Sequence, residues 1–285
     1  MVKSGGIEPF IDTITLHNGY CLPTSPEISL KKIFSLRESS SRGIYEIAHA
    51  FRNDRAGKLH LQEFTMIEWY RKDCEYNELV NDVTDLIQVI RNVKPAPPLE
   101  KSAIVCVDEL FENIFKVKPQ ANWGFQDYHE LALQTKILHA EIKTSSETEA
   151  LHLNEVFTLL YDHAVIQLSQ SAKELVFIKD YPWFLRGMAK LNSAGWAMRV
   201  EAYLHNLELC SGYQELDDAD ELREVWEYNN QIRKAAGKEI HPLDVNLIHN
   251  AKSMTGVSGM ALGLERTIMA SFNIPDIREF MLHGI

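Results

Sequence analysis

The chain has 285 residues, of which 45% are hydrophobic and 24% are charged, and its formal net charge is −11. This length can bury one large core, so we expect a single domain over residues 1–285. The negative charge argues against a general nucleic-acid binder, because neutralisation of phosphates supplies most of that affinity. No apolar run approaches the ~20 residues of a membrane span, and four scattered cysteines are typical of free thiols in a cytoplasmic protein.

Strand and helix patterns follow one another along the chain. A turn at residues 24–26 leads into a helix that begins near Glu27. Periodicity then predicts, in chain order, strands at 44–51 and 63–70, a helix at 76–90 stopped by Pro95, Pro97 and Pro98, a strand at 103–107, a helix from a cap at Asp108 to Phe115, helices near 127–139 and 147–170, and strands at 175–178 and 198–204. A turn at His205 and Asn206 reverses the chain after the last strand.

The loop between the first two predicted strands is cationic. It contains Arg52, Arg55, Lys58 and His60, and Phe64 follows it. Arg52 can hold two oxygens of a phosphate at once, and Phe64 can offer its ring to a base. The loop therefore suits an anionic phosphate ligand, although charge alone favours a solvated hairpin tip.

Two glutamates flank the last predicted turn. If the turn centres on Leu204 and His205, Glu201 and Glu208 lie directly opposite each other on one face of a hairpin. Like charges in that position are destabilising unless a cation neutralises them, and carboxylate oxygens suit Mg²⁺ carried by nucleotide phosphates. A shift of one residue in register would instead place one glutamate in solvent, and both arrangements remain open.

Several segments together resemble class II aminoacyl-tRNA synthetases of the lysyl type. The residues FRND at 51–54 and HLQEFTMIE at 60–68 resemble motif 2, and GMALGLER at 259–266 resembles motif 3. TSPE at 24–27 and the three glutamates of 201–215 also follow the family pattern. The resemblance implies an α+β fold with an antiparallel sheet flanked by helices.

Two features are similar to one branch of this family, the elongation factor P–lysine ligases. These are HPLDVNL at 241–247 and Ala261, which trims the amino-acid pocket and is thought to favour β-lysine. The resemblance extends from about Pro23 to the C-terminus. It implies that ATP and Mg²⁺ are used to activate lysine or β-lysine as an adenylate, which is transferred to a lysine side chain of elongation factor P. There is no room for an anticodon-binding domain, so tRNA binding is not expected.

The family pattern also implies roles for individual residues. For ATP it implies Arg52 at the α-phosphate and the substrate carboxylate, Arg266 at the terminal phosphate and adenine, His60 at the outer phosphates, and Phe64 and Asp54 at adenine. For Mg²⁺ it implies Glu201 and Glu208, of which Glu208 also belongs to the ATP site. For the amino acid it implies Glu27, Tyr70 and Glu215 at the amines, with Ser211 and Ala261 also in the pocket.

Departures from the pattern keep other functions open. Asp54 replaces the usual glutamate, and Leu61 and Ser211 each replace an asparagine. Motif 1, which builds the dimer interface of the family, is missing, so a homodimer is left open and the N-terminus is expected to be incomplete or truncated. Two alternatives follow. One is a catalytically inactive paralogue that binds nucleotide as a regulator, and the other is an adenylating ligase for a different amino acid.

Overall fold

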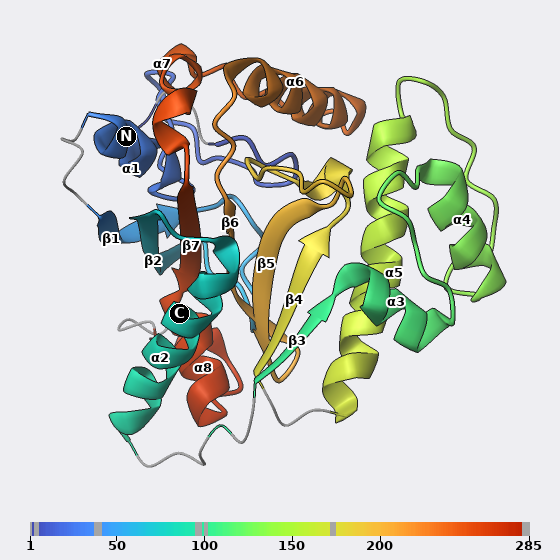
Figure 1. Cartoon of the computed structure of the whole chain (residues 1–285), viewed down its shortest axis with the longest axis horizontal. Helices are drawn as coiled ribbons and strands as arrows, with labels where there is room; N and C mark the ends of the chain where they lie inside the picture. The colour runs from blue at the N-terminus through green and yellow to red at the C-terminus, as the bar shows by residue number, and fades with distance from the viewer. Residues whose placement is uncertain are drawn as a thin grey trace.

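A seven-stranded sheet runs through the molecule (Figure 1). The computed structural model describes residues 2, 6–36, 42–94, 99, 102–171 and 175–280. In these ranges the strands are β1 (Gly43–Phe51), β2 (Glu63–Lys72), β3 (Ser102–Cys106), β4 (Leu175–Tyr181), β5 (Ala197–Leu204), β6 (Leu207–Gln214) and β7 (Val257–Gly263). Their order is β1-β2-β7-β6-β5-β4-β3, with β3 and β4 parallel and the other neighbours antiparallel. The predicted α+β fold is confirmed.

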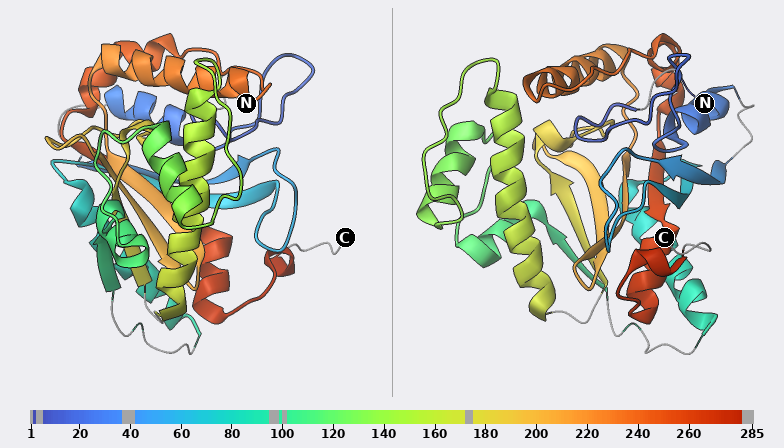
Figure 2. Two further views of the ribbon diagram at one scale, coloured as in Figure 1. Left: turned by 90° about the vertical axis from the view of Figure 1, so that its right-hand side faces the viewer. Right: turned by 180° about the vertical axis from the view of Figure 1, so that it is seen from behind.

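Helices pack against both faces of this sheet. They are α1 (Glu27–Ser35), α2 (Leu79–Asn92), α3 (Val107–Phe115), α4 (Phe125–Gln134), α5 (Glu149–Ser171), α6 (Ala219–Ala235), α7 (Val245–His249) and α8 (Leu264–Phe272), with short 3₁₀ turns at Tyr76–Glu78, Trp183–Leu185, Ala251–Met254 and Ile277–Phe280. In Figure 2 the long helix α5 stands beside β4 and β5, and α6 crosses one end of the sheet. None of the helices in the described ranges is both long enough and apolar enough to cross a membrane.

The alternation of side chains along β4 explains why the sheet has two separate cores. Val176 and Ile178 point to the face covered by α3, α4 and α5, whereas Leu175 and Phe177 point to the face covered by α2 and α8. Successive side chains of a strand leave opposite faces, so both faces of a central strand can be buried. The cavities described below lie on the first of these faces, beyond α5.

The elements predicted from periodicity agree with the structure in most places. The register from Gly43↔Arg71 to Phe51↔Glu63 confirms the first two strands. The cap of α3 is Cys106, so the prediction that Asp108 caps this helix is wrong, because the helix already begins at Val107. The three prolines thought to stop the second helix lie outside the described residues, and α2 ends at Asn92.

The hairpin of β5 and β6 differs from the prediction in its register. His205 and Asn206 have φ angles of 53° and 65°, so they form a two-residue turn that pairs Leu204 with Leu207. Glu208 therefore lies opposite Tyr203, while Glu201 lies opposite Ser211. The prediction that Glu201 and Glu208 directly oppose each other is wrong, because the turn centres one residue later than assumed.

One extra residue in β6 then brings Glu208 and Ser211 to the same face of the sheet. The register shifts between Ala202 and Tyr203, which leaves Leu209 as a β-bulge. Leu209 and Cys210 are both buried in the core under α2 and α8. Because two consecutive residues point into that core, Glu208 and Ser211 both face the opposite side, three residues apart.

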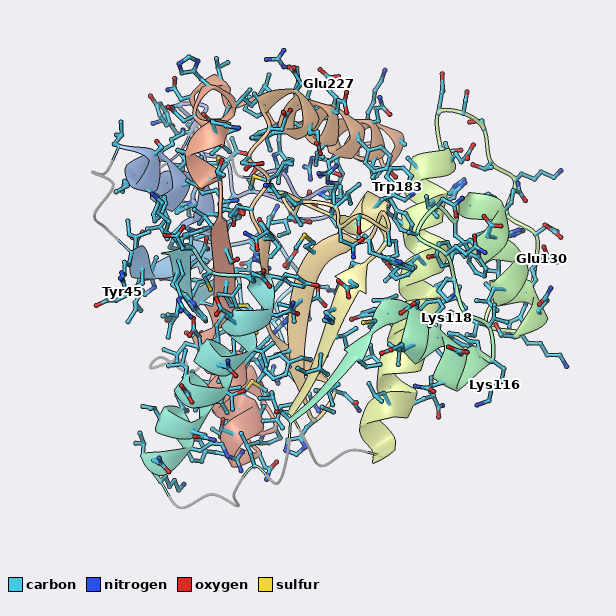
Figure 3. The ribbon with its side chains drawn as sticks, in the orientation of Figure 1. Tyr45, Lys116, Lys118, Glu130, Trp183 and Glu227 are labelled. Atoms are coloured by element: carbon cyan, nitrogen blue, oxygen red, sulfur yellow. The ribbon has the colours of Figure 1, made fainter. Side chains whose placement is uncertain are left out.

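One edge of the sheet is uncovered. Tyr45 on β1 is 73% exposed and projects outward at the rim of the molecule (Figure 3). Ile47, two residues further along the same face, is 61% exposed. The functional residues predicted from the sequence lie on α1, in the loop after β1, on or directly after the inner strands and on α8.

Candidate active site

Two adjoining cavities lie on the face of β2, β6 and β7 that α2 and α8 do not cover. The larger cavity has a volume of about 260 Å³ and the smaller about 110 Å³. Five residues line both of them: Arg52, Met66, Glu208, Ser211 and Ala261. We call this shared region the junction, because a molecule in one cavity meets a molecule in the other there.

The smaller cavity brings together the predicted phosphate and base residues. Its lining includes Arg52, Asp54, His60, Phe64 and Arg266. The central guanidinium carbon of Arg52 lies 5.2 Å from the centre of the Phe64 ring, a cation–π contact that orients both side chains. Burial and the charge of Arg266 lower the pKa of His60, which favours its neutral form.

The loop that carries these residues is folded back on itself. Arg52 N–H donates to the carbonyl of Gln62 at 2.9 Å, and Gly57 N–H donates to the carbonyl of His60 at 2.9 Å. Ile277 N–H, from the C-terminal region, donates to the carbonyl of Lys58 at 2.9 Å. These bonds hold the loop beside the cavity, while Arg55, Lys58 and His60 remain exposed.

An ion pair that the sequence analysis missed lies against the larger cavity, which its two glutamates, Glu27 and Glu215, line. Lys31 is 2% exposed, and its ammonium lies 2.9 Å from Glu27 Oε1 and 2.6 Å from Glu215 Oε2. The same ammonium lies 5.6 Å and 5.1 Å from the ring centres of Tyr70 and Tyr213. The available signal was a lysine on the apolar stripe of a helix, four residues after a glutamate.

The sequence analysis named Glu68 only as the last residue of motif 2. In the structure Glu68 lines the larger cavity. It is 2% exposed, and the Tyr70 hydroxyl donates to its Oε1 at 2.5 Å. Within the described residues, Glu68 Oε2 and Glu215 Oε1 have no hydrogen-bond partner. Two buried carboxylate oxygens in one cavity without a donor are what a substrate ammonium would satisfy.

The electrostatics of this cavity favour a cationic ligand. Burial raises the pKa of Glu215 to about 8, even though Lys31 opposes the shift. Burial disfavours a charged Lys31, but the carboxylates of Glu215 and Glu27 outweigh it and raise the pKa of Lys31. An incoming ammonium would therefore displace a proton from Glu215 and restore its charge.

The N-terminal segment forms one wall of the larger cavity and was not assigned a role from the sequence. Gly6, Ile7, Glu8 and Ile11 line the cavity. The buried guanidinium of Arg233 on α6 holds the segment by donating to the carbonyls of Pro9 and Ile11, both at 3.0 Å. Asn53 N–H also holds the segment by donating to the carbonyl of Asp12 at 2.9 Å, so tertiary contacts define this wall.

Gly259 allows the predicted amine-binding residues to approach one another. A Cβ at this position would lie 2.4 Å from the Tyr70 ring and 2.8 Å from Glu215 Oε1. Both distances are shorter than real contacts, so either side chain would have to move. The predicted motif therefore requires glycine at this position for a steric reason, which the sequence alone did not show.

The structure brings together all but one of the predicted site residues. Those that line at least one cavity are Glu27, Arg52, Asp54, His60, Phe64, Tyr70, Glu208, Ser211, Glu215, Ala261 and Arg266. Glu201 lines neither. It is 6% exposed, and the hydroxyls of Tyr203 and Tyr181 donate to its Oε2 at 2.6 Å and 2.8 Å.

The two predicted magnesium ligands have different surroundings. Glu208 faces the junction, whereas the oxygens of Glu201 are already bound by protein donors. Among the described residues, no group of three or more His, Cys, Asp or Glu side chains is arranged to hold a metal ion. Of the two predicted ligands, only Glu208 has carboxylate oxygens available at the cavities.

Comparison with known proteins agrees with the motifs. A family model described as tRNA synthetases class II (D, K and N) matches residues 2–284. A protein named elongation factor P–(R)-β-lysine ligase in Avibacterium paragallinarum is 31% identical over 273 residues, which cover 93% of this chain and 77% of that protein. Proteins of the same name in Haemophilus ducreyi and Pasteurella multocida are 28% and 29% identical over 95% and 93% of this chain, and 77% of each relative.

Proposed function

Because this chain belongs to the class II tRNA synthetases (D, K and N) and is a synthetase-like ligase, we propose that it activates lysine or β-lysine with ATP and transfers it to a lysine side chain of elongation factor P. The observation that carries this proposal is the pair of cavities joined at Arg52. One has unpaired carboxylate oxygens for an amine, and the other has an aromatic ring and arginines for a nucleotide.

The smaller cavity is proposed to hold ATP. Phe64 and Arg266 would lie against adenine, and Asp54 would accept a hydrogen bond from its amine. His60 would contact the outer phosphates, and Arg52 would reach the α-phosphate at the junction. A guanidinium matches two phosphate oxygens at once, which is why arginine suits both positions.

The larger cavity is proposed to hold the amino acid with its carboxylate at the junction. Glu27 would meet the amine nearest the carboxylate, while Glu68, Tyr70 and Glu215 would surround the side-chain amine. Ser211 and Ala261 line the junction, where they would border the carboxylate. The name shared by the relatives supports a lysine-type substrate and elongation factor P as the acceptor.

The proposed reaction has two steps. An oxygen of the substrate carboxylate attacks the α-phosphorus of ATP, and the bond to pyrophosphate breaks. The amine of the acceptor lysine then attacks the carbonyl carbon, and AMP leaves with the carboxylate oxygen. No covalent bond to the protein forms, so positioning and charge stabilisation by residues such as Arg52 must supply the acceleration.

Amino-acid-dependent exchange of pyrophosphate into ATP tests this proposal. We expect exchange with L-lysine or β-lysine and none with norleucine, which has the same chain length as lysine without the terminal amine. Failure of every amino acid would favour the nucleotide-binding regulator, and exchange with an amino acid lacking a side-chain amine would favour a ligase for another substrate. Homodimer formation and the absence of tRNA binding stay predictions.

The KM for the lysine-type substrate is expected to fall as pH rises. Below the Glu215 pKa of about 8, binding of an ammonium must expel a proton, so KM should drop by up to about tenfold per unit between roughly pH 6 and pH 8. The side-chain amine of the substrate stays charged over this range. Steady-state exchange at fixed ionic strength measures the slope.

The matched control is Glu215→Gln, which cannot titrate. Its KM should be higher than that of the unaltered chain and should change little with pH. An unaltered chain whose KM is flat over the same range would contradict proton displacement from this carboxyl.

A further inference from the structure

Glu201 is surrounded by donors from three different elements. The hydroxyls of Tyr203 on β5 and Tyr181 on β4 donate to its Oε2 at 2.6 and 2.8 Å, and the hydroxyl of Tyr161 on α5 lies 3.5 Å from the same oxygen. Tyr161 also bonds Tyr181 and, at 3.3 Å, Tyr203. All three tyrosines belong to the buried core beneath α5, so the cluster is dry and has little room to rearrange.

The other oxygen of Glu201 is bound by Arg199. Arg199 Nη2 lies 2.9 Å from Glu201 Oε1, and Nη1 donates to the carbonyl of Leu185 at 2.9 Å. The guanidinium also lies 5.4 Å from the centre of the Tyr181 ring. A carboxylate accepts about four hydrogen bonds, and Arg199, Tyr181 and Tyr203 already occupy three of these positions on Glu201.

Arg199 is exposed to the larger cavity, unlike the glutamate that holds it. It lines this cavity together with Glu8 and Ser211. Its position on β5 faces Tyr213 on β6, and Ser211 is the residue opposite Glu201. Arg199 and Ser211 are therefore diagonal neighbours on the cavity face, within reach of a long side chain.

Glu208 has a different environment. It lines both cavities at the junction, and within the described residues no side chain is hydrogen-bonded or ion-paired to its carboxylate. A divalent cation that arrives on nucleotide phosphates can therefore reach Glu208 without displacing any protein donor. To bind Glu201 it would have to displace Arg199 from one oxygen or the tyrosine hydroxyls from the other.

From these contacts we propose that Glu201 is a positioning residue that fixes Arg199 in the wall of the larger cavity, and that it is not a ligand of the divalent cation. Glu208 is then the one of the two glutamates that meets the cation. Arg199, fixed by Glu201, supplies a positive charge for the carboxylate of the amino acid beside the short side chain of Ser211. This inference rests on the proposed binding of nucleotide at the junction.

Binding of Mn²⁺ with a non-hydrolysable ATP analogue, measured by electron paramagnetic resonance, separates the two glutamates. Glu208→Gln should weaken Mn²⁺ binding by about tenfold or more, whereas Glu201→Gln should leave it within about twofold of the unaltered chain. Equal weakening in the two variants would overturn the inference and leave the proposed function standing. No binding of Mn²⁺ and nucleotide to the unaltered chain would overturn both.

Tyr181→Phe keeps the ring and removes one donor, so it tests the same point with little risk to folding. If Glu201 were a cation ligand, freeing part of its carboxylate would tighten Mn²⁺ binding. We expect no change in Mn²⁺ binding, and a tighter dissociation constant would contradict the proposal.

A double-mutant cycle tests the link between Glu201 and Arg199. Glu201→Gln and Arg199→Gln should each raise the KM of the amino acid by about tenfold, and the double variant should be no worse than the more impaired single variant. The KM for ATP should stay nearly constant in all three. Independent effects, which would multiply to about a hundredfold, would show that Glu201 does not act through Arg199.

Discussion

Replacing Arg52 with alanine is expected to reduce amino-acid-dependent exchange of pyrophosphate into ATP by at least about 10³-fold. Arg52 lines both cavities and is the one cation among the residues that they share. A positive charge at this point would draw the attacking carboxylate and the α-phosphate together and would stabilise the charge that develops between them. Its loss removes both effects, so the rate constant of exchange should fall and not only the KM.

The fold should survive this change. The hydrogen bond of the Arg52 side chain to the protein, from Nε to the carbonyl of Thr24, is long at 3.4 Å. Arg55→Ala is the matched control, because Arg55 is an exposed arginine of the same loop that lines neither cavity, and its activity should stay within about twofold of the unaltered chain. An Arg52→Ala variant that keeps more than a tenth of the activity would contradict the assignment.

Replacing Lys31 with methionine is expected to destabilise the protein by about 3–5 kcal/mol, because it leaves buried carboxylates without their counter-ion. Lys31 joins Glu27 on its own helix to Glu215, which follows the end of β6. Without the ammonium these carboxylates repel each other and take up protons. The variant should therefore also bind a lysine-type substrate more weakly. Chemical denaturation gives the first quantity and exchange kinetics give the second.

The neighbouring residue provides the control for this prediction. Lys32 pairs with Asp244, but its side chain is 34% exposed, and an exposed ion pair contributes only about 0–1 kcal/mol. Lys32→Met should therefore change stability and KM little. If the two methionine variants lost stability and substrate affinity equally, burial of the Lys31 ion pair would not make it more important than the exposed pair.

The strands that carry the site were predictable because their side chains alternate. Phe64, Met66, Glu68 and Tyr70 lie on one face of β2, so the same period that identifies the strand also brings these residues to the two adjoining cavities. The family motifs then identified Arg52 and Arg266, which come from opposite ends of the chain and line the same cavity. At these positions the local sequence pattern and the family motifs were sufficient to predict the site residues.

The register of the second hairpin could not be read from the sequence. Glu201 and Glu208 share a face because Glu208 pairs with Tyr203, two residues along from Glu201, and the bulge at Leu209 brings Ser211 to that face as well. A bulge depends on how two neighbouring residues pack into the core, and strand periodicity contains no signal for it. The prediction of two equivalent metal ligands followed from the simpler register.

The partners of Glu201 and Lys31 could not be predicted from the sequence for a different reason. Tyr161 reaches Glu201 from α5 across forty residues, and Lys31 reaches Glu215 across nearly two hundred. Periodicity placed Tyr161 and Lys31 on helices and gave neither a partner. Contacts between distant segments decide which buried charges are paired, and these contacts exist only once the sheet has formed.

The most direct test of the account follows the oxygen of the substrate carboxylate. Lysine or β-lysine with a heavy oxygen isotope in its carboxylate is incubated with ATP, elongation factor P and this chain, and the AMP is analysed by mass spectrometry. If a carboxylate held at Arg52 attacks the α-phosphate, each AMP released on transfer carries one heavy oxygen. Heavy oxygen in inorganic phosphate, or AMP without the label, would contradict adenylation at the junction of the two cavities.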